Sequence, residues 1–131
     1  MSEMKKGNVV PILGLITGVG LLLFWIGFFT VGLAPENPPP CYFVYEHAFP
    51  LPDIILALVL IAGGVLNLKG VPHGAKLLIA GGGALAFLGV LDFSFNIQNG
   101  MYAISTLDLV LNAFINLWSA VFGVVLAVRA R

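Results

Sequence analysis

Charged residues are scarce in this sequence. Only 9% of its 131 residues are charged and 60% are hydrophobic, whereas a soluble domain of this size has about 25% charged residues. We therefore expect one domain, residues 1–131, that lies in the lipid bilayer, with no separate soluble or catalytic unit. The six basic residues are scattered rather than gathered in a stripe, which argues against a nucleic-acid partner.

Cysteine is almost absent as well. Cys41 is the only one, so no intramolecular disulfide and no C-x-x-C redox pair can form. A free thiol and a bridge to another chain both stay open. Gly81-Gly82-Gly83 lacks the Lys and Ser/Thr that follow in a phosphate-binding loop. No catalytic activity is evident, and we expect no cofactor.

Four long apolar segments dominate the chain, at about residues 9–33, 52–68, 75–95 and 106–128. Each can cross a hydrocarbon core of about 30 Å as a helix, tilted or flanked by polar ends as its length requires. The first is longer than the usual apolar stretch of about 7–15 residues in a signal peptide, so we expect a retained span. The sequence predicts an all-α, integral membrane four-helix bundle.

The charges are sorted by sign between the two sets of segment ends, and only Glu3 departs from this sorting. Because Lys and Arg accumulate on the cytoplasmic side, we expect a multi-pass protein of the plasma membrane with both termini cytoplasmic. The basic ends carry Lys5, Lys6, Lys69, Lys76, Arg129 and Arg131. The opposite ends carry Glu36, Glu46, Asp53, Asp92 and Asp108.

Residues 34–51 form the longest connection and are rich in proline and aromatic side chains. Prolines stiffen a connection, and aromatic rings favour the level of the lipid head groups. We expect this segment to lie as a loop over the outer end of the bundle and to determine its specificity.

Asp53 and Asp92 are expected at matching depths. Each is separated by 15 residues from a lysine, Lys69 and Lys76 respectively. Such a stretch covers roughly 22 Å as a helix, less than the hydrocarbon thickness of about 30 Å. Because the two segments form a hairpin, we expect the two aspartates to be neighbours inside the outer boundary.

A polar stripe marks the last segment. Asp108, Asn112, Asn116 and Ser119 follow at spacings of 4, 4 and 3, which places them on one helical face. Polar groups in a span face the bundle interior or a wet cavity, so Trp118 is expected in other surroundings. The candidate ligand-binding residues are Glu46, Asp53, Asp92, Asp108, Asn112 and Asn116.

Several of these residues also have a structural explanation. Asp53 begins a helix, where the dipole favours an anion, and Ser105-x-x-Asp108 resembles a capping box. Asp92 lies near a helix C-terminus, where the dipole disfavours an anion, and no outer Lys or Arg neutralises it. Glu46-His47 is first interpreted as a surface pair. The alternatives are a proton relay or, with Asp53 and Asp92, a set of metal ligands, although the spacing matches no compact metal motif.

Gly14-x-x-x-Gly18 is a close-packing motif of membrane helices. It favours contact within the bundle, with contact between two copies of the chain as the alternative.

Two segments carry a resemblance to known proteins. Tyr45–Asp53 and Leu91–Tyr102 resemble small prokaryotic four-helix membrane proteins that have no assigned function. Glu46-x-x-Phe49-x-Leu51-Pro52 is similar to the start of the second helix in the emopamil-binding-protein-like sterol isomerase superfamily, whose helical bundles hold acidic residues in a sterol cavity. This chain is shorter, and its first span has no acidic residue.

Three functions follow from these patterns. The first is a structural, accessory or binding bundle whose partners are the lipid bilayer and a second copy or another membrane protein. The second is an outward-facing pocket, lined by carboxylates, that binds or moves a proton, a cation or a small amphipathic molecule. The third is a membrane isomerase acting on a lipid, with Glu46 and Asp92 as acid and base.

Overall fold

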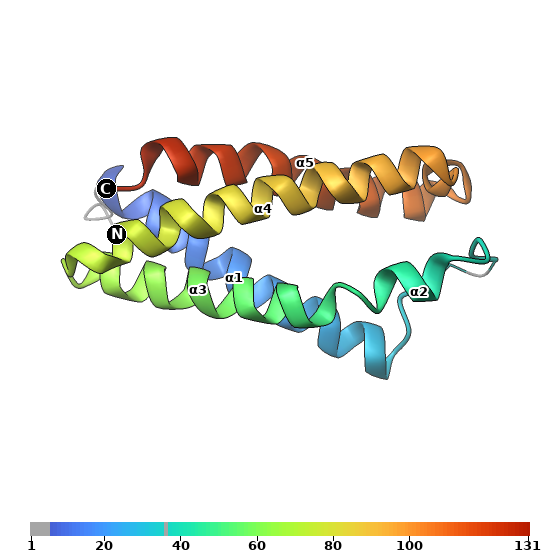
Figure 1. The fold of residues 1–131 in the computed structure, drawn as a ribbon, viewed down its shortest axis with the longest axis horizontal. Coiled ribbons are helices and arrows are strands. Elements are labelled where there is room, and N and C mark those ends of the chain that lie inside the picture. The colour runs from blue at the N-terminus through green and yellow to red at the C-terminus, as the bar shows by residue number, and fades with distance from the viewer. Residues whose placement is uncertain (1–5, 36) are drawn as a thin grey trace.

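The computed structural model describes residues 6–35 and 37–131. Three residues of the charge pattern, Glu3, Lys5 and Glu36, lie outside the described residues. The helices follow in the order α1 (Lys6–Thr30), α2 (Tyr42–Glu46), α3 (Pro50–Leu68), α4 (Pro72–Gln98), η1 (Met101–Ala103) and α5 (Thr106–Arg129). Figure 1 shows α1, α3, α4 and α5 running lengthwise.

The all-α prediction is confirmed for the described part of the chain. Four helices there are long and apolar enough to cross a membrane, one for each expected segment. The first ends at Thr30 rather than at residue 33, because Gly32 adopts a positive φ of 87° and donates its amide to the Gly27 carbonyl. The third extends to Gln98 rather than to residue 95.

Local sequence explains several helix starts. Pro72 occupies the first turn of α4, where a missing amide proton costs no hydrogen bond. Ser105 caps α5, since its hydroxyl oxygen accepts a hydrogen bond from the Asp108 amide at 3.0 Å. The Ser105 half of the predicted capping box is therefore confirmed, whereas the Asp108 carboxylate accepts from the Ser105 hydroxyl and not from its backbone amide.

The connection at residues 34–51 is not wholly a loop as expected. Residues 42–46 form the short helix α2, and Tyr42 is buried in an aromatic cluster with Trp25, Phe28 and Met101. Burial of the Tyr42 ring at this end of the bundle stabilises α2, because Tyr42 is the first residue of that helix. The segment still lies at the end of the bundle where α4 ends and α5 begins (Figure 1).

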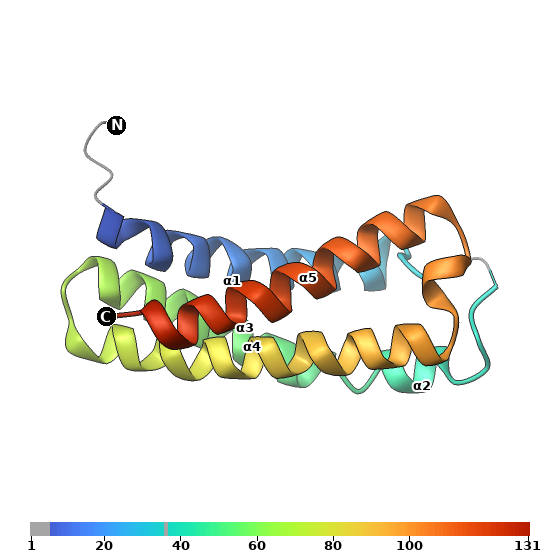
Figure 2. The same ribbon diagram turned by 90° about the horizontal axis from the view of Figure 1, so that it is seen from above.

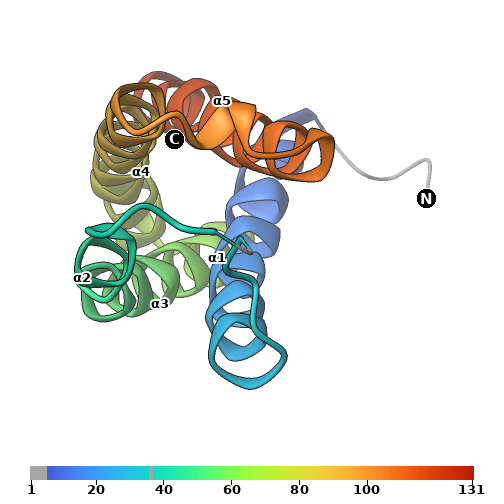
Figure 3. The same ribbon diagram turned by 90° about the vertical axis from the view of Figure 1, so that its right-hand side faces the viewer.

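Each long helix packs mainly on its neighbour in the sequence: α1 on α3, α3 on α4, and α4 on α5. By contrast, α1 and α5 make few contacts. Figures 1 and 3 show α1 diverging from α5 towards the end that carries α2 and η1. The bundle is thus closed along three helix pairs and open along the fourth.

The two ends of the bundle differ in charge. We call the end with Glu46, Asp53, Asp92 and Asp108 the acidic end. At the other, basic end the side-chain amide of Asn67 donates to the Arg131 carbonyl at 2.6 Å. Figure 2 shows the start of α1, the α3–α4 turn and the C-terminus together there. The described basic residues of these segments are Lys69, Lys76, Arg129 and Arg131.

Glycine allows the closest helix contacts. A Cβ atom added at Gly18 would lie 2.8 Å from the Ala57 carbonyl oxygen of α3, so Gly14-x-x-x-Gly18 packs within the bundle. A Cβ atom at Gly82 of α4 would lie 2.6 Å from the carbonyl oxygen of Gly123 in α5. Neither pair of helices can approach this closely with a larger residue at the crossing.

Trp118 does not lie in other surroundings as expected. Its ring stacks on Phe122 at 4.8 Å and packs against the buried leucine core. Its indole nitrogen donates to the Thr17 hydroxyl of α1 at 3.0 Å. The expectation failed because Trp118 adjoins Ser119 on the inner face of α5, and its one polar atom finds a partner across the bundle.

We predict that Gly123→Ala destabilises the bundle whereas Gly83→Ala does not. A Cβ atom at Gly123 would meet backbone atoms of Ala86 in α4, and one at Gly83 meets nothing within 4 Å. Overpacking costs about 1–3 kcal/mol, whereas alanine improves helix propensity by up to about 1 kcal/mol. The midpoints of SDS-induced unfolding in mixed micelles measure the difference. Equal midpoints for the two variants would contradict the close contact.

Candidate functional site

A cavity of about 490 Å³ lies between α1 and α3 on one side and α4 and α5 on the other. Four residues of α1 and α5 line the cavity and are also exposed on the outside of the bundle. Because they belong to both surfaces, they mark the mouth of the cavity. These are Ile16 (57% exposed) and Gly20 on α1, and Leu111 and Phe114 (63% exposed) on α5. The cavity therefore opens sideways, between the two helices that diverge.

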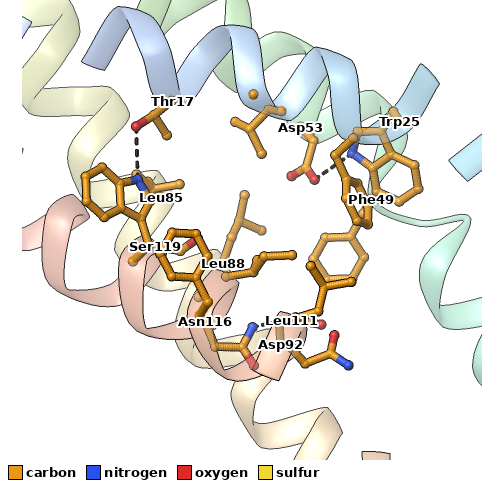
Figure 4. Close-up of a pocket in the computed structure, with 18 of the residues that line it drawn as sticks. Thr17, Trp25, Phe49, Asp53, Leu85, Leu88, Asp92, Leu111, Asn116 and Ser119 are labelled. Atoms are coloured by element: carbon orange, nitrogen blue, oxygen red, sulfur yellow. Dashed lines mark hydrogen bonds between the residues drawn. The ribbon is translucent and has the colours of Figure 1, made fainter. Parts of the chain in front are cut away.

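Towards the basic end the cavity closes about one helical turn beyond the bond between Trp118 and Thr17, where Leu13 lines it. Figure 4 shows Thr17 near this boundary, and the dashed line marks its hydrogen bond. Beyond this bond Leu78 and Leu126 are fully buried in the core. Packed leucine side chains thus separate the cavity from the basic end of the bundle.

Asp53 lies in the first turn of α3 and is only 8% exposed. Its Oδ2 atom accepts a hydrogen bond from the Trp25 indole nitrogen at 2.8 Å. This bond ties α3 to α1, and the helix N-terminus places favourable dipoles behind the carboxylate. Figure 4 shows the Asp53 carboxylate directed towards the cavity.

Asp92 belongs to a hydrogen-bond network that joins α2, α4, η1 and α5. Its Oδ1 atom accepts from the Tyr45 hydroxyl at 3.1 Å, and its Oδ2 atom accepts from the Asn116 amide at 2.6 Å. Asn96 donates to the Asn116 carbonyl oxygen at 2.9 Å, and the Tyr102 hydroxyl donates to the same oxygen. Asp92 acts only as an acceptor in these hydrogen bonds, so none of them requires a proton on its carboxylate.

Tyr102 supports the network from outside the long helices. It follows Met101 in η1 and is half-buried. Burial raises the pKa of the Tyr102 hydroxyl above its ordinary value. The Tyr102 hydroxyl donates to the side-chain oxygen of Asn116.

The two aspartates expected to be neighbours share the cavity but not a hydrogen bond. Both line the cavity, and Figure 4 shows them on different walls. Each carboxylate is held by its own donors, Trp25 for Asp53 and Tyr45 with Asn116 for Asp92. The expected matching depth stays a prediction, and depth alone does not determine which side chains touch.

The other candidates also line the cavity. Asp108 accepts from the Ser105 hydroxyl at 2.7 Å, and Asn112 donates to the Asp108 backbone carbonyl at 2.9 Å. Both thus have local partners within the first turns of α5. Glu46 is half-buried and accepts no hydrogen bond from the described residues. His47 is exposed and stacks on Phe29 at 6.0 Å, and it does not line the cavity.

Asn116, which donates to Asp92, was a sequence candidate, but four other residues of these hydrogen bonds were not. They are Trp25, Tyr45, Asn96 and Tyr102. The sequence did contain one indication of their role. Each of these side chains carries a hydrogen-bond donor, and each lies near the acidic end of the bundle, where the carboxylates are. Aromatic residues at that level have a simpler explanation as head-group anchors, which concealed their role as donors.

Comparisons with protein-family models, with curated proteins and with solved structures find no match to this chain. The fold and the site define an all-α bundle with four membrane-length helices and a laterally open cavity that is acidic at one end.

We predict that Asn116→Ala lowers stability far more than Asn112→Ala. The first change removes a donor to Asp92 and the acceptor for Asn96 and Tyr102, at a cost of about 1–3 kcal/mol for unsatisfied buried groups. The second removes one bond to a carbonyl of the same helix. Thermal unfolding in detergent tests this, and similar losses for both variants would show that the network does not hold the bundle together.

Proposed function

We propose that this protein is an integral membrane protein that binds a small amphipathic molecule in the cavity between α1 and α5. The observation that carries the proposal is the position of the mouth, between two helices whose outer faces are apolar. The volume of the cavity, about 490 Å³, lies within the range of about 300–1,000 Å³ that is usual for small-molecule sites.

Membrane insertion is part of this proposal. The helices expose large apolar side chains around their whole outer surface, including Leu23, Ile26, Phe87, Val110 and Leu117. Water would make such a surface aggregate, whereas acyl chains cover it without cost. In a bilayer the mouth of the cavity then faces lipid, and a hydrophobic molecule reaches it by lateral diffusion.

The cavity favours binding over a purely structural role. A structural or accessory subunit needs the hydrogen bonds of Asp53 and Asp92, which stabilise the helix pairs, but it does not need an open space beside them. A complete transport path is less well supported, because packed leucines lie between the Thr17–Trp118 bond and the basic end. An isomerase needs a free acid and base, and both oxygens of Asp92 already accept hydrogen bonds.

We predict that Gly20→Leu abolishes binding and that Gly83→Leu leaves it intact. Both glycines are exposed within helices and have nothing within 4 Å of an added Cβ atom, but only Gly20 lines the cavity. The new side chain fills the mouth without disturbing the packing of the bundle. The matched change at Gly83 reports any general effect of leucine on insertion or helix stability.

The two tryptophans of the chain, Trp25 and Trp118, both line the cavity and provide the measurement. A dodecyl alcohol with a bromine at the end of its chain is titrated into nanodiscs that contain the protein. Saturable quenching of tryptophan fluorescence is expected in the parent protein and in Gly83→Leu, but not in Gly20→Leu. Identical quenching in all three proteins would mean that the probe acts from the lipid and not from the cavity.

We also propose that the acidic end faces the outside and that both termini are cytoplasmic, as the basic flanks favour. Cys41 is exposed and is the only cysteine. A membrane-impermeant maleimide is therefore expected to label it in intact cells. The control is the double variant Cys41→Ser, His73→Cys, whose single cysteine lies at the exposed start of α4. This cysteine should react only after the membrane is permeabilised. Labelling of the control in intact cells would reverse the orientation.

A further inference from the structure

We propose that the molecule bound in the cavity is a cation, with an ammonium head group held between Glu46 and Asp53 and an apolar chain that extends towards Trp118. This inference rests on the proposed function, since it names the chemical class of the ligand for the same cavity. It follows from three observations: the charge of the lining, the unused acceptors of two carboxylates, and the aromatic wall beside them.

Among the described residues, the lining of the cavity contains acidic but no basic side chains. Four carboxylates line it, and no described Lys, Arg or His does. Negative charge in an apolar space is costly unless a positive charge or hydrogen-bond donors compensate it. A bound ammonium group would supply both, whereas an anionic ligand would add to the repulsion. The four residues are Glu46, Asp53, Asp92 and Asp108.

Two of these carboxylates have acceptor atoms that the protein does not use. Asp53 is more than nine-tenths buried, and within the described residues only its Oδ2 atom accepts a hydrogen bond, from Trp25. Its carboxylate points towards the cavity (Figure 4). Glu46 accepts no hydrogen bond in the described part of the chain. Asp92, in contrast, uses both oxygens, so the head group is assigned to Glu46 and Asp53.

Aromatic rings surround the same end of the cavity. Trp25, Tyr42 and Phe49 line it, and the face of an aromatic ring attracts an ammonium group. Tyr42 is buried, and its hydroxyl has no hydrogen-bond partner among the described residues. The wall therefore provides both ring faces and a further acceptor oxygen for a nitrogen-centred cation.

A small metal ion fits this lining less well than an organic cation. No three His, Cys, Asp or Glu side chains of the described residues converge on a point where they would hold a metal ion. The remaining lining is apolar and reaches from the carboxylates to Trp118, which suits an alkyl chain. This apolar part consists chiefly of Leu13, Ile16, Leu21, Leu85, Leu88 and Ile115.

The experiment compares three probes that differ only in the head group. Dodecyl chains with a terminal bromine carry a primary ammonium, a hydroxyl or a carboxylate group. Each is titrated into nanodiscs of zwitterionic lipid with the parent protein, Glu46→Gln or Asp53→Asn, and tryptophan quenching gives the affinity. Gly20→Leu supplies the background from probe dissolved in the lipid. Single-tryptophan variants, Trp25→Phe and Trp118→Phe, report which end of the probe lies near which ring.

We expect the ammonium probe to bind the parent protein about tenfold or more tightly than the alcohol, as a hydrogen bond between charged groups allows. This preference should shrink in Glu46→Gln and Asp53→Asn, while the affinity for the alcohol stays the same, which shows that both variants keep the cavity. The terminal bromine should quench Trp118 more strongly than Trp25.

Equal affinities for the ammonium and the alcohol, tighter binding of the carboxylate, or a preference that persists in both variants would each overturn the inference while leaving an amphipathic ligand in place. Failure of the proposed function gives a different result, because then none of the three probes would quench above the Gly20→Leu background.

Discussion

The hydrogen bonds of Asn116 are the interaction on which the acidic end of this bundle depends. One side chain on α5 donates to Asp92 of α4 and accepts from Asn96 of α4 and Tyr102 of η1. Through Asp92 the same network reaches Tyr45 of α2. An amide is suited to this position because it donates and accepts at once. Without it, Asp92 would keep the Tyr45 hydroxyl but lose the Asn116 donor, and the Asn96 amide and the Tyr102 hydroxyl would lose the oxygen that accepts from them.

Two kinds of contact hold the helices together. One is close backbone contact at glycines, and the other is a small set of side-chain hydrogen bonds between helices. Gly82 and Gly123 let α4 and α5 meet along their backbones, and Gly18 does the same for α1 against α3. Among the glycines that the structure describes, none makes such a contact between α1 and α5, which are linked through the Thr17–Trp118 bond and a small number of neighbouring contacts. The cavity exists because two tight helix pairs diverge beyond that bond.

Much of the fold was predictable because length and charge act on whole segments. The lengths of the apolar segments predicted four helices. The spacing of Asp108, Asn112 and Asn116 predicted that one face of α5 is directed to the interior of the bundle. The bond between Trp25 and Asp53 was not predictable, since it depends on how α1 is rotated against α3. That rotation is set by the contact of Gly18 with Ala57, and one glycine motif among 16 glycines does not identify its partner in advance.

In the view of Figure 1, the divergence of α1 from α5 also gives the bundle a wedge outline, narrow at the basic end and wider at the acidic end. In the membrane-inserted state that we propose, such a wedge would displace more lipid area in one leaflet than in the other. Lateral pressure in the wider leaflet would then press α1 towards α5, whereas a leaflet stretched by curvature would relieve that pressure. The tension and curvature of the surrounding bilayer would thereby act mechanically on the width of the cavity mouth, through the same helices that form its rim.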